Sequence, residues 1–283
     1  MTVSKPRIGV IGQGFVGKNY ADDLEERGYD VVRYALEEPY RANKEHIKEC
    51  EVVFIAVPTP TTPAGFDDSI VREAFDLIAP TACVVIKSTI VPGTTRRLHT
   101  AHPSMTVFFS PEFLSEATAA EDARHPFANI LGHAVADARH QEAADRIHAL
   151  LPAAPFARTC DSIEAELIKY AHNVNGYVQI ILSNLLYDFS VHAGVSWEPI
   201  QEAIEADPYI SNRYARPVHK SGRGAGGHCF IKDFAAFTNA YAEATKDETG
   251  IAILRALAAK NAELLRATGK SVDLLEHVYG TGQ

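Results

Sequence analysis

A glycine-rich turn near the amino terminus constrains the fold of this chain more than any other segment. Residues 7–11 (RIGVI) predict a short buried strand, and a helical pattern then runs through Arg27. Between them stand Gly12, Gln13, Gly14, Phe15, Val16 and Gly17. The pattern G-x-G-x-x-G between a strand and a helix is typical of a dinucleotide site, because its glycines allow a tight turn and expose backbone N–H groups to a pyrophosphate. We therefore expect a dinucleotide there rather than a purely structural turn.

Strand and helix patterns alternate over the following residues. The apolar run Val52 to Val57 predicts a parallel strand that is covered on both faces. Further strands are expected at 30–34, 83–86, 105–109 and 129–135, and helices at 69–78 and 141–151. The alternation predicts an α/β fold with a Rossmann-type doubly wound parallel sheet, whose ligand lies beyond the carboxyl ends of the strands. Two polar segments fall at such ends, Lys87-Ser88-Thr89 and Ser110-Pro111-Glu112.

The period of the apolar residues changes after residue 160. Asp161 and Glu164 form a capping pair, and apolar residues then recur at three- and four-residue spacing until Gly194. This pattern predicts one long helix that buries one face. Lys169 and Asn173 are four residues apart and share a face of that helix.

The change of period also suggests a division into domains. Shorter helices are expected at 197–205, 234–244 and 251–267, with an irregular stretch at 207–220. We expect a dinucleotide-binding Rossmann domain over residues 1–160 and an all-helical dimerisation and substrate domain over residues 161–283.

Composition narrows the classes of function. Lys and Arg number 27 against 36 Asp and Glu, a net charge of −9, so a nucleic-acid partner is not expected. The four cysteines lie far apart and form no C-x-x-C pair, which argues against a disulfide framework and a zinc site. With no signal-peptide pattern and no apolar run long enough to span a bilayer, we expect a cytoplasmic protein and no metal.

A second glycine-rich stretch, residues 221–233 (SGRGAGGHCFIKD), contains the candidate nucleophile Cys229. Glycines let the backbone approach a ligand closely, so the cysteine would lie in a backbone-lined pocket. A mobile loop beside a small buried thiol is the alternative, and taken alone the cluster favours it.

Six motifs in order resemble the UDP-glucose/GDP-mannose dehydrogenase family of nucleotide-sugar dehydrogenases over nearly the whole chain. They are GQGFVG at Gly12, VPTP at Val57, KSTIVPGT at Lys87, SPEFLSEA at Ser110, AELIKYAHN at Ala165 and GAGGHCFIKD at Gly224. The resemblance implies a four-electron oxidation of a sugar primary alcohol to a carboxylate by a homodimer, with two NAD used in succession. It also implies that Cys229 holds the substrate as a thiohemiacetal and then as a thioester.

The resemblance implies a role for each matching residue. Lys169 and Asn173 stabilise the oxyanion, Lys169 and Asp233 take part in proton transfer, and Glu116 and Thr89 position water. The implied catalytic residues are Cys229, Lys169, Asn173, Asp233, Glu116, Thr89 and Glu112. The implied substrate contacts are Arg213, which reaches across from the partner subunit, and Gly226, Gly227 and Lys232. The implied cofactor contacts are Gly12, Gly14, Phe15, Val16, Gly17, Pro58, Thr59, Ser88 and Thr89.

Some features depart from the family pattern. Ala35 replaces the acid expected at the end of the second strand, so NADP is not excluded, and Arg33 or Arg41 could meet its 2′-phosphate. We expect a short form of the family, without its third, nucleotide-binding domain. Two alternatives stay open: a two-electron dehydrogenase of the β-hydroxyacid type, against which Cys229 speaks, and a non-catalytic relative that only binds nucleotides.

Overall fold

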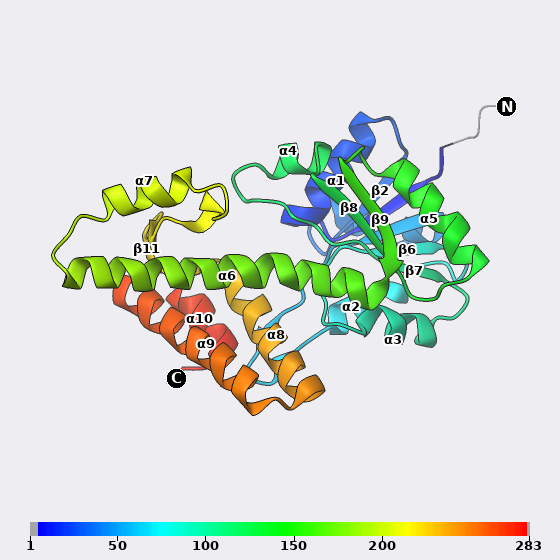
Figure 1. The fold of residues 1–283 in the computed structure, drawn as a ribbon. Helices are drawn as coiled ribbons and strands as arrows, with labels where there is room; N and C mark the ends of the chain where they lie inside the picture. Colours follow the sequence, from blue (N-terminus) through cyan, green and yellow to red (C-terminus); the bar gives the residue numbers. More distant parts are fainter. Residues whose placement is uncertain (1–4, 282–283) are drawn as a thin grey trace. The chain divides into compact units, whose positions relative to one another are not determined.

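The chain divides into two compact units in the computed structural model, which describes residues 5–281 (Figure 1). The first unit extends to Pro60 and resumes from Asp67 to Lys169. The second consists of Thr61–Phe66 and the described residues from Tyr170 onward. The helix α6, Ser162–His192, begins in the first unit and continues into the second.

The first unit is built on a seven-stranded sheet in the order β2-β1-β3-β6-β7-β8-β9. Its strands are β1 (Ile8–Ile11), β2 (Val31–Tyr34), β3 (Val52–Ile55), β6 (Cys83–Ile86), β7 (Thr106–Phe109), β8 (Ala128–His133) and β9 (Phe156–Asp161). Every neighbouring pair is parallel except β7 and β8, where Phe108 pairs with His133 in antiparallel register. The predicted Rossmann-type sheet is confirmed. Its one antiparallel pair was not foreseen, because an apolar run indicates burial and not strand direction.

Helices flank this sheet (Figure 1). They are α1 (Phe15–Glu26), η1 (Tyr40–Glu49, a 3₁₀ helix), α2 (Ser69–Phe75), α3 (Thr94–Ala101), α4 (Ala119–Arg124) and α5 (Ala138–Leu150). One apolar core cluster joins Leu24 of α1 and Ile147 of α5 to strand residues such as Val10, Phe54 and Phe108. Burial of these side chains contributes on the order of 2 kcal/mol each and holds the strand ends in fixed positions.

The second unit consists mainly of helices. Besides α6 it contains α7 (Glu198–Ala206), η2 (Asn212–Tyr214), α8 (His228–Thr245), α9 (Glu248–Thr268) and α10 (Val272–Tyr279). Two short hairpins, β4–β5 (Thr61–Thr62 and Gly65–Phe66) and β10–β11 (Val218–His219 and Gly222–Arg223), interrupt the helical character that was predicted. A core cluster that includes Tyr177 and Ile181 of α6, Phe234 of α8 and Leu257 of α9 packs these helices together.

The helix that follows the second glycine-rich stretch starts earlier than predicted. The apolar pattern suggested a start at residue 234, whereas α8 begins at His228. Gly227, with φ of 85°, ends the loop in a conformation that side chains rarely adopt, and the helix starts directly after it. Cys229 therefore lies in the first turn of α8.

The helix α6 is capped as predicted. The Asp161 N–H donates to Glu164 Oε2 at 2.9 Å, and the Ile163 N–H donates to Asp161 Oδ1 at 2.9 Å. Gly194, with φ of 70°, follows its last turn.

The prediction that α6 buries one apolar face is confirmed for only some of the residues on that face. Tyr170 and Ile181 are buried, but Leu185 is 45% exposed and Phe189 71% exposed. Leu167 is also 45% exposed. The helices α8 and α9 pack against part of the apolar surface of α6, and other apolar side chains of this helix are exposed.

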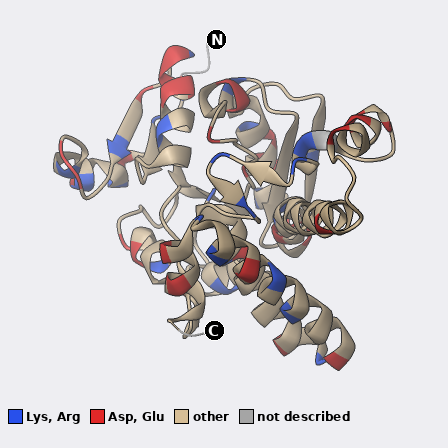
Figure 2. Cartoon of the chain, turned by 90° about the vertical axis from the view of Figure 1, so that its left-hand side faces the viewer, with Lys and Arg blue, Asp and Glu red and all other residues tan. Residues whose placement is uncertain are grey.

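Charged residues of both signs are distributed over the helices. Figure 2 shows lysine and arginine interspersed with aspartate and glutamate along the ribbon rather than gathered on one basic face. Within residues 5–281, none of the helices combines the length and the apolar character that crossing a membrane requires.

Candidate active site

The first glycine-rich turn is shaped by close backbone contacts. Gly12, with φ of 92°, donates its N–H to the Tyr34 carbonyl at 2.8 Å. A Cβ at Gly12 would lie 2.2 Å from the Ala56 oxygen, and one at Gly17 would lie 1.9 Å from the Gly12 oxygen. Side chains are therefore excluded from both positions, and the end of β1 is held tightly against the start of α1.

The N-terminus of α1 is open above this turn. A Cβ at Gly14, the N-cap residue, would meet no atom within 4 Å. No side chain caps the helix, and its first turn contains no acid. Phe15 is 44% exposed and Val16 is partly buried. Backbone N–H groups at such a helix end favour an anion, so the residues fit the pyrophosphate of a dinucleotide.

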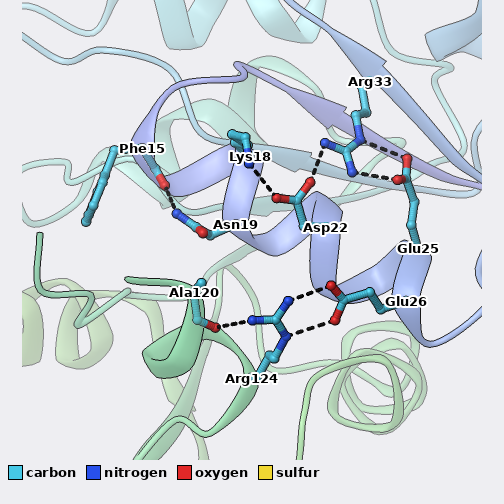
Figure 3. Close-up of polar contacts among 9 residues, drawn as sticks. All are labelled: Phe15, Lys18, Asn19, Asp22, Glu25, Glu26, Arg33, Ala120 and Arg124. Atoms are coloured by element: carbon cyan, nitrogen blue, oxygen red, sulfur yellow. Dashed lines mark hydrogen bonds and ion pairs between the residues drawn. The ribbon is translucent and has the colours of Figure 1, made fainter. Parts of the chain in front are cut away.

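Arg33, near the end of β2, forms ion pairs with two acids (Figure 3). Arg33 contacts Asp22 Oδ1 at 2.7 Å and Glu25 Oε2 at 2.6 Å, both on α1, and its side chain is only 12% exposed. Ala35 is buried, and the exposed acids Glu37 and Glu38 follow. The arginine of β2 is therefore neutralised by acids of its own unit.

Hydrogen bonds join the loops after β3 and β6. The Ser88 hydroxyl accepts from the Val57 N–H at 2.9 Å and donates to the Val57 carbonyl at 2.7 Å. The Thr59 hydroxyl donates to the Thr89 carbonyl at 2.7 Å, and both threonines are buried. Pro58 is exposed. Of these predicted cofactor residues, Ser88 and Thr59 use their side chains to fix the loops.

The first unit brings together two predicted catalytic residues, Glu112 and Lys169. The Lys169 ammonium donates to the Glu112 carbonyl oxygen at 2.7 Å and to Glu112 Oε1 at 2.9 Å, and both side chains are buried. Burial alone would raise the pKa of Glu112, but Lys169 and the Leu114 N–H hold it below its ordinary value. Thr89 is buried in the same unit, and Glu116 is exposed.

Lys87 is a third buried charged group. The sequence predicted its place at the end of a strand but gave no indication of its role. Its ammonium donates to the Ser110 hydroxyl at 2.9 Å and lies 4.2 Å from the centre of the Tyr20 ring. Burial lowers the pKa of Lys87 to about 7, with Lys169 acting in the same direction and Glu112 opposing. A strand-end lysine was visible in the sequence, but nothing there indicated that it is enclosed.

The first turns of α6 are fixed by Glu166, which is fully buried. Its carboxylate accepts the Gly93 N–H at 2.6 Å, the Thr95 N–H at 2.9 Å and the Thr95 hydroxyl at 2.6 Å. These donors lie at the N-terminus of α3, where a carboxylate is favoured. Glu166 thereby sets the position of Lys169, which follows three residues later.

The second unit brings together Asn173 and Asp233. Asn173 donates its side-chain N–H to Asp233 Oδ2 at 2.6 Å, and Lys232 pairs with Asp233 Oδ1 at 2.5 Å. Asp233 is 1% exposed, so its carboxylate is fixed by an amide on one side and an ammonium on the other.

Cys229 is one helical turn before Asp233 on α8 and is exposed, unlike the other three cysteines. A thiol in the first turn of a helix is favoured as the thiolate, the nucleophilic form. The predicted substrate residues Gly226 and Gly227 lie just before it, and Arg213 is exposed in η2 with its guanidinium 5.8 Å from the Tyr214 ring. Within residues 5–281, no three His, Cys, Asp or Glu side chains form a group that could hold a metal ion.

The two halves of the chain match models of a single protein family. Residues 35–151 match the NAD binding domain of the UDP-glucose/GDP-mannose dehydrogenase family, and residues 163–263 match its central domain. A UDP-glucose 6-dehydrogenase of Haloferax volcanii, AglM, is 29% identical over 280 residues, covering 81% of this chain and 64% of the relative. The chain spans 45% and 50% of the related UDP-glucose 6-dehydrogenases of Rickettsia conorii and Pseudomonas aeruginosa.

Solved structures share the fold. A UDP-glucose dehydrogenase from Pyrobaculum islandicum superposes with a TM-score of 0.79 at 27% identity, over 94% of this chain and 70% of that one. The 3-hydroxyisobutyrate dehydrogenase of Mycobacterium tuberculosis gives a TM-score of 0.74 at 17% identity, over 99% of this chain and all of that one. At 17% identity, this second likeness concerns the fold alone.

Proposed function

Because this chain belongs to the UDP-glucose/GDP-mannose dehydrogenase family, we propose that it oxidises the primary alcohol of a nucleotide-linked sugar to a carboxylate. The oxidation removes four electrons, so two NAD are reduced for each carboxylate. The observation that carries this proposal is the thiol of Cys229 in the first turn of α8, one turn from the buried Asp233. We assign residues 1–160 to the cofactor and residues 161–283 to substrate binding and dimerisation.

The cofactor would be held by the turn from Gly12 to Gly17 and by the loops that contain Pro58, Thr59, Ser88 and Thr89. When bound, NAD supplies the acceptor for a hydride. The pyrophosphate fits the open N-terminus of α1 at Gly14. The chain's remaining task is to bind the sugar, through Arg213, Gly226, Gly227 and Lys232, and to move protons.

The first oxidation needs a base for the hydroxyl proton. The Asp233 carboxylate is proposed to accept that proton, and the Lys169 ammonium to stabilise the developing alkoxide, as the alcohol becomes an aldehyde and its hydride passes to the bound NAD. Glu112 holds the lysine through its carbonyl and its carboxylate, and Asn173 holds the aspartate. Both groups are thus oriented before substrate arrives, which lowers the cost of reorganisation.

The second oxidation uses the thiol. The Cys229 thiolate adds to the aldehyde carbon and gives a thiohemiacetal, whose oxygen is stabilised by Lys169 and Asn173. Loss of a second hydride from that carbon gives a thioester. A water positioned by Glu116 and Thr89 then adds to the thioester, the carbon–sulfur bond breaks, and the carboxylate, the thiolate and the two protons of the water are released.

Product stoichiometry tests the proposal. With a panel of UDP- and GDP-linked sugars, the wild-type protein should form two NADH per carboxylate. The Cys229→Ser variant should lose carboxylate formation, and Cys160→Ser, a half-buried thiol in β9, should keep it. One NADH per turnover together with a fully active Cys229→Ala would instead indicate a two-electron dehydrogenase. Binding of NAD and sugar nucleotide with no turnover would indicate a non-catalytic relative.

We propose NAD rather than NADP as the preferred cofactor. Arg33 is held by Asp22 and Glu25 and offers no ready cation for a 2′-phosphate. The exposed acids Glu37 and Glu38 after β2 would repel that phosphate. Ala35 cannot make the hydrogen bond to the ribose that an acidic residue would make. The preference for NAD over NADP therefore rests on repulsion of the 2′-phosphate more than on attraction of the ribose.

We also propose that the protein is a cytoplasmic homodimer in which a second copy covers α6 and α7. Six apolar residues of α6 are 45% to 71% exposed: Leu167, Leu182, Leu185, Leu186, Phe189 and Val191. The helix α7 has no buried residue and borders a groove lined by Pro199, Ile200, Ala203, Ile204, Asp207 and Ile210. So large an apolar surface on one unit is typical of an interface, and a copy of this chain offers a matching surface.

A further inference from the structure

The loop that precedes Cys229 is held by residues near the end of α9, more than thirty positions later in the chain. The Arg223 N–H donates to the Thr268 hydroxyl at 3.1 Å. The Ala225 N–H donates to Asn261 Oδ1 at 2.7 Å, and Asn261 Nδ2 donates back to the Ala225 carbonyl at 3.0 Å. The loop backbone therefore has fixed partners in a neighbouring helix, as a strand would have in a sheet.

Lys270 holds the carbonyls of the same loop. Its ammonium donates to the Gly224 carbonyl at 2.8 Å and to the Gly222 carbonyl at 3.4 Å. Burial, with Lys220 nearby, lowers the pKa of Lys270 below its ordinary value. An ammonium is retained in this half-buried position because two carbonyl oxygens replace part of its hydration.

The next residue, Ser271, holds the end of the loop. The Gly227 N–H donates to the Ser271 hydroxyl at 3.2 Å. A Cβ at Gly226 would lie 2.7 Å from that hydroxyl and 3.0 Å from Lys270 Cε, so a side chain at Gly226 would push the two segments apart. The loop and the turn after α9 are packed too closely for either to move alone.

The helix α10 fixes that turn against the helix that contains the thiol. Leu275 and Val278 of α10 share a buried core cluster with Ile231 and Ala235 of α8 and Leu265 of α9. Ile231 follows Cys229 by two residues. The turn at Lys270 is therefore anchored on both sides, by α9 before it and by α10 after it.

We propose that Lys270 is a positioning residue, whose ammonium fixes the Gly222 and Gly224 carbonyls and thereby presents Cys229 in the first turn of α8. The catalytic role of Cys229 rests on the proposed function, but the positioning itself does not. Without Lys270, two carbonyls lose a charged donor, the loop opens more often, and the first turn of α8 frays.

Three variants test this role without requiring turnover. Lys270→Met removes the charge at similar length, Lys270→Arg keeps donors for the carbonyls, and Lys246→Met changes an exposed lysine at the far end of α8. Hydrogen exchange of residues 222–230 should rise about tenfold in Lys270→Met, and alkylation of Cys229 by iodoacetamide near neutral pH should slow several-fold. Lys270→Arg should recover most of both effects, and Lys246→Met should match the wild type.

Activity provides a separate readout. If the wild type oxidises a nucleotide sugar, Lys270→Met should lower kcat about tenfold and leave the KM for NAD unchanged, because the cofactor site lies in the first unit. If no sugar is oxidised, the proposed function fails while exchange and alkylation still decide the role of Lys270. Wild-type exchange and alkylation in a folded Lys270→Met would overturn the positioning role. If Lys270→Met does not fold, Ser271→Gly provides a second test, because glycine tolerates the left-handed backbone conformation of Ser271. Hydrogen exchange at Gly227 must then rise in Ser271→Gly for the proposal to stand.

Discussion

The buried Lys87 predicts an unusual dependence of stability on pH. Its pKa is about 7 in the folded chain against an ordinary value of 10.5, so between these values the unfolded chain binds one more proton. Stability must therefore rise with pH in that window, because burying the ammonium is costly and burying the neutral amine is not. Below about pH 7 both states are protonated, and the full cost of burial is present.

The variant Lys87→Met isolates this contribution, since it removes the charge and keeps an unbranched chain. From about pH 6.5 to about pH 8.5, the stability of the wild type relative to Lys87→Met should rise by about 2 kcal/mol. Taking the difference cancels most of the titration of other groups. Lys18→Met, at an exposed lysine of α1, is the control and should show little pH dependence relative to the wild type.

The assay must follow the first unit. The chain's single tryptophan, Trp197, lies in the second unit, so tryptophan fluorescence would report on the wrong part of the molecule. Urea unfolding followed by far-ultraviolet circular dichroism, with native-state hydrogen exchange of β6 as a local check, avoids that error. A difference that stays flat within about 0.5 kcal/mol would refute the reasoning, and would mean that attraction to Glu112 outweighs burial.

Three further predictions concern other parts of the molecule. Glu166→Gln should lower the free energy of unfolding by about 2 kcal/mol in urea titrations, because buried donors of α3 lose a charged acceptor; an unchanged midpoint would mean that water replaces it. Phe189→Asp should shift a dimer to a monomer in sedimentation velocity, whereas a wild type that is already monomeric contradicts the proposed interface. Glu37→Arg should raise kcat/KM for NADP about tenfold relative to NAD, and no change would place the 2′-phosphate elsewhere.

Elements whose apolar pattern is local were predictable from the sequence. The strands β1, β2, β3, β6 and β7 and the start of α6 at its Asp161–Glu164 cap follow from residues that are neighbours in the chain. The antiparallel direction of β8 and the start of α8 at His228 were missed. Both depend on interactions with distant segments, since β8 takes its direction from β7 and the loop before α8 is held by Asn261 of α9.

The same distinction explains which site residues were found. Motifs located Glu112 and Lys169 separately, but the contact between residues 57 positions apart is a tertiary fact. Neighbouring residues in the sequence did not indicate that Lys87 is buried or that Lys270 contacts the glycine loop. A lysine at a strand end or in a turn is normally predicted to be solvated. A sequence pattern indicates which groups are present, and packing decides which of them are dehydrated.

The helix α6 shows where a local pattern does constrain the chemistry. It contributes Lys169 to the cluster with Glu112 in the first unit and Asn173 to the cluster with Asp233 in the second. These two residues are four positions apart, and a continuous helix makes that spacing one turn of a rigid element, whatever the rest of the fold does. Their shared face therefore follows from the helical pattern alone, whereas their partners depend on tertiary packing.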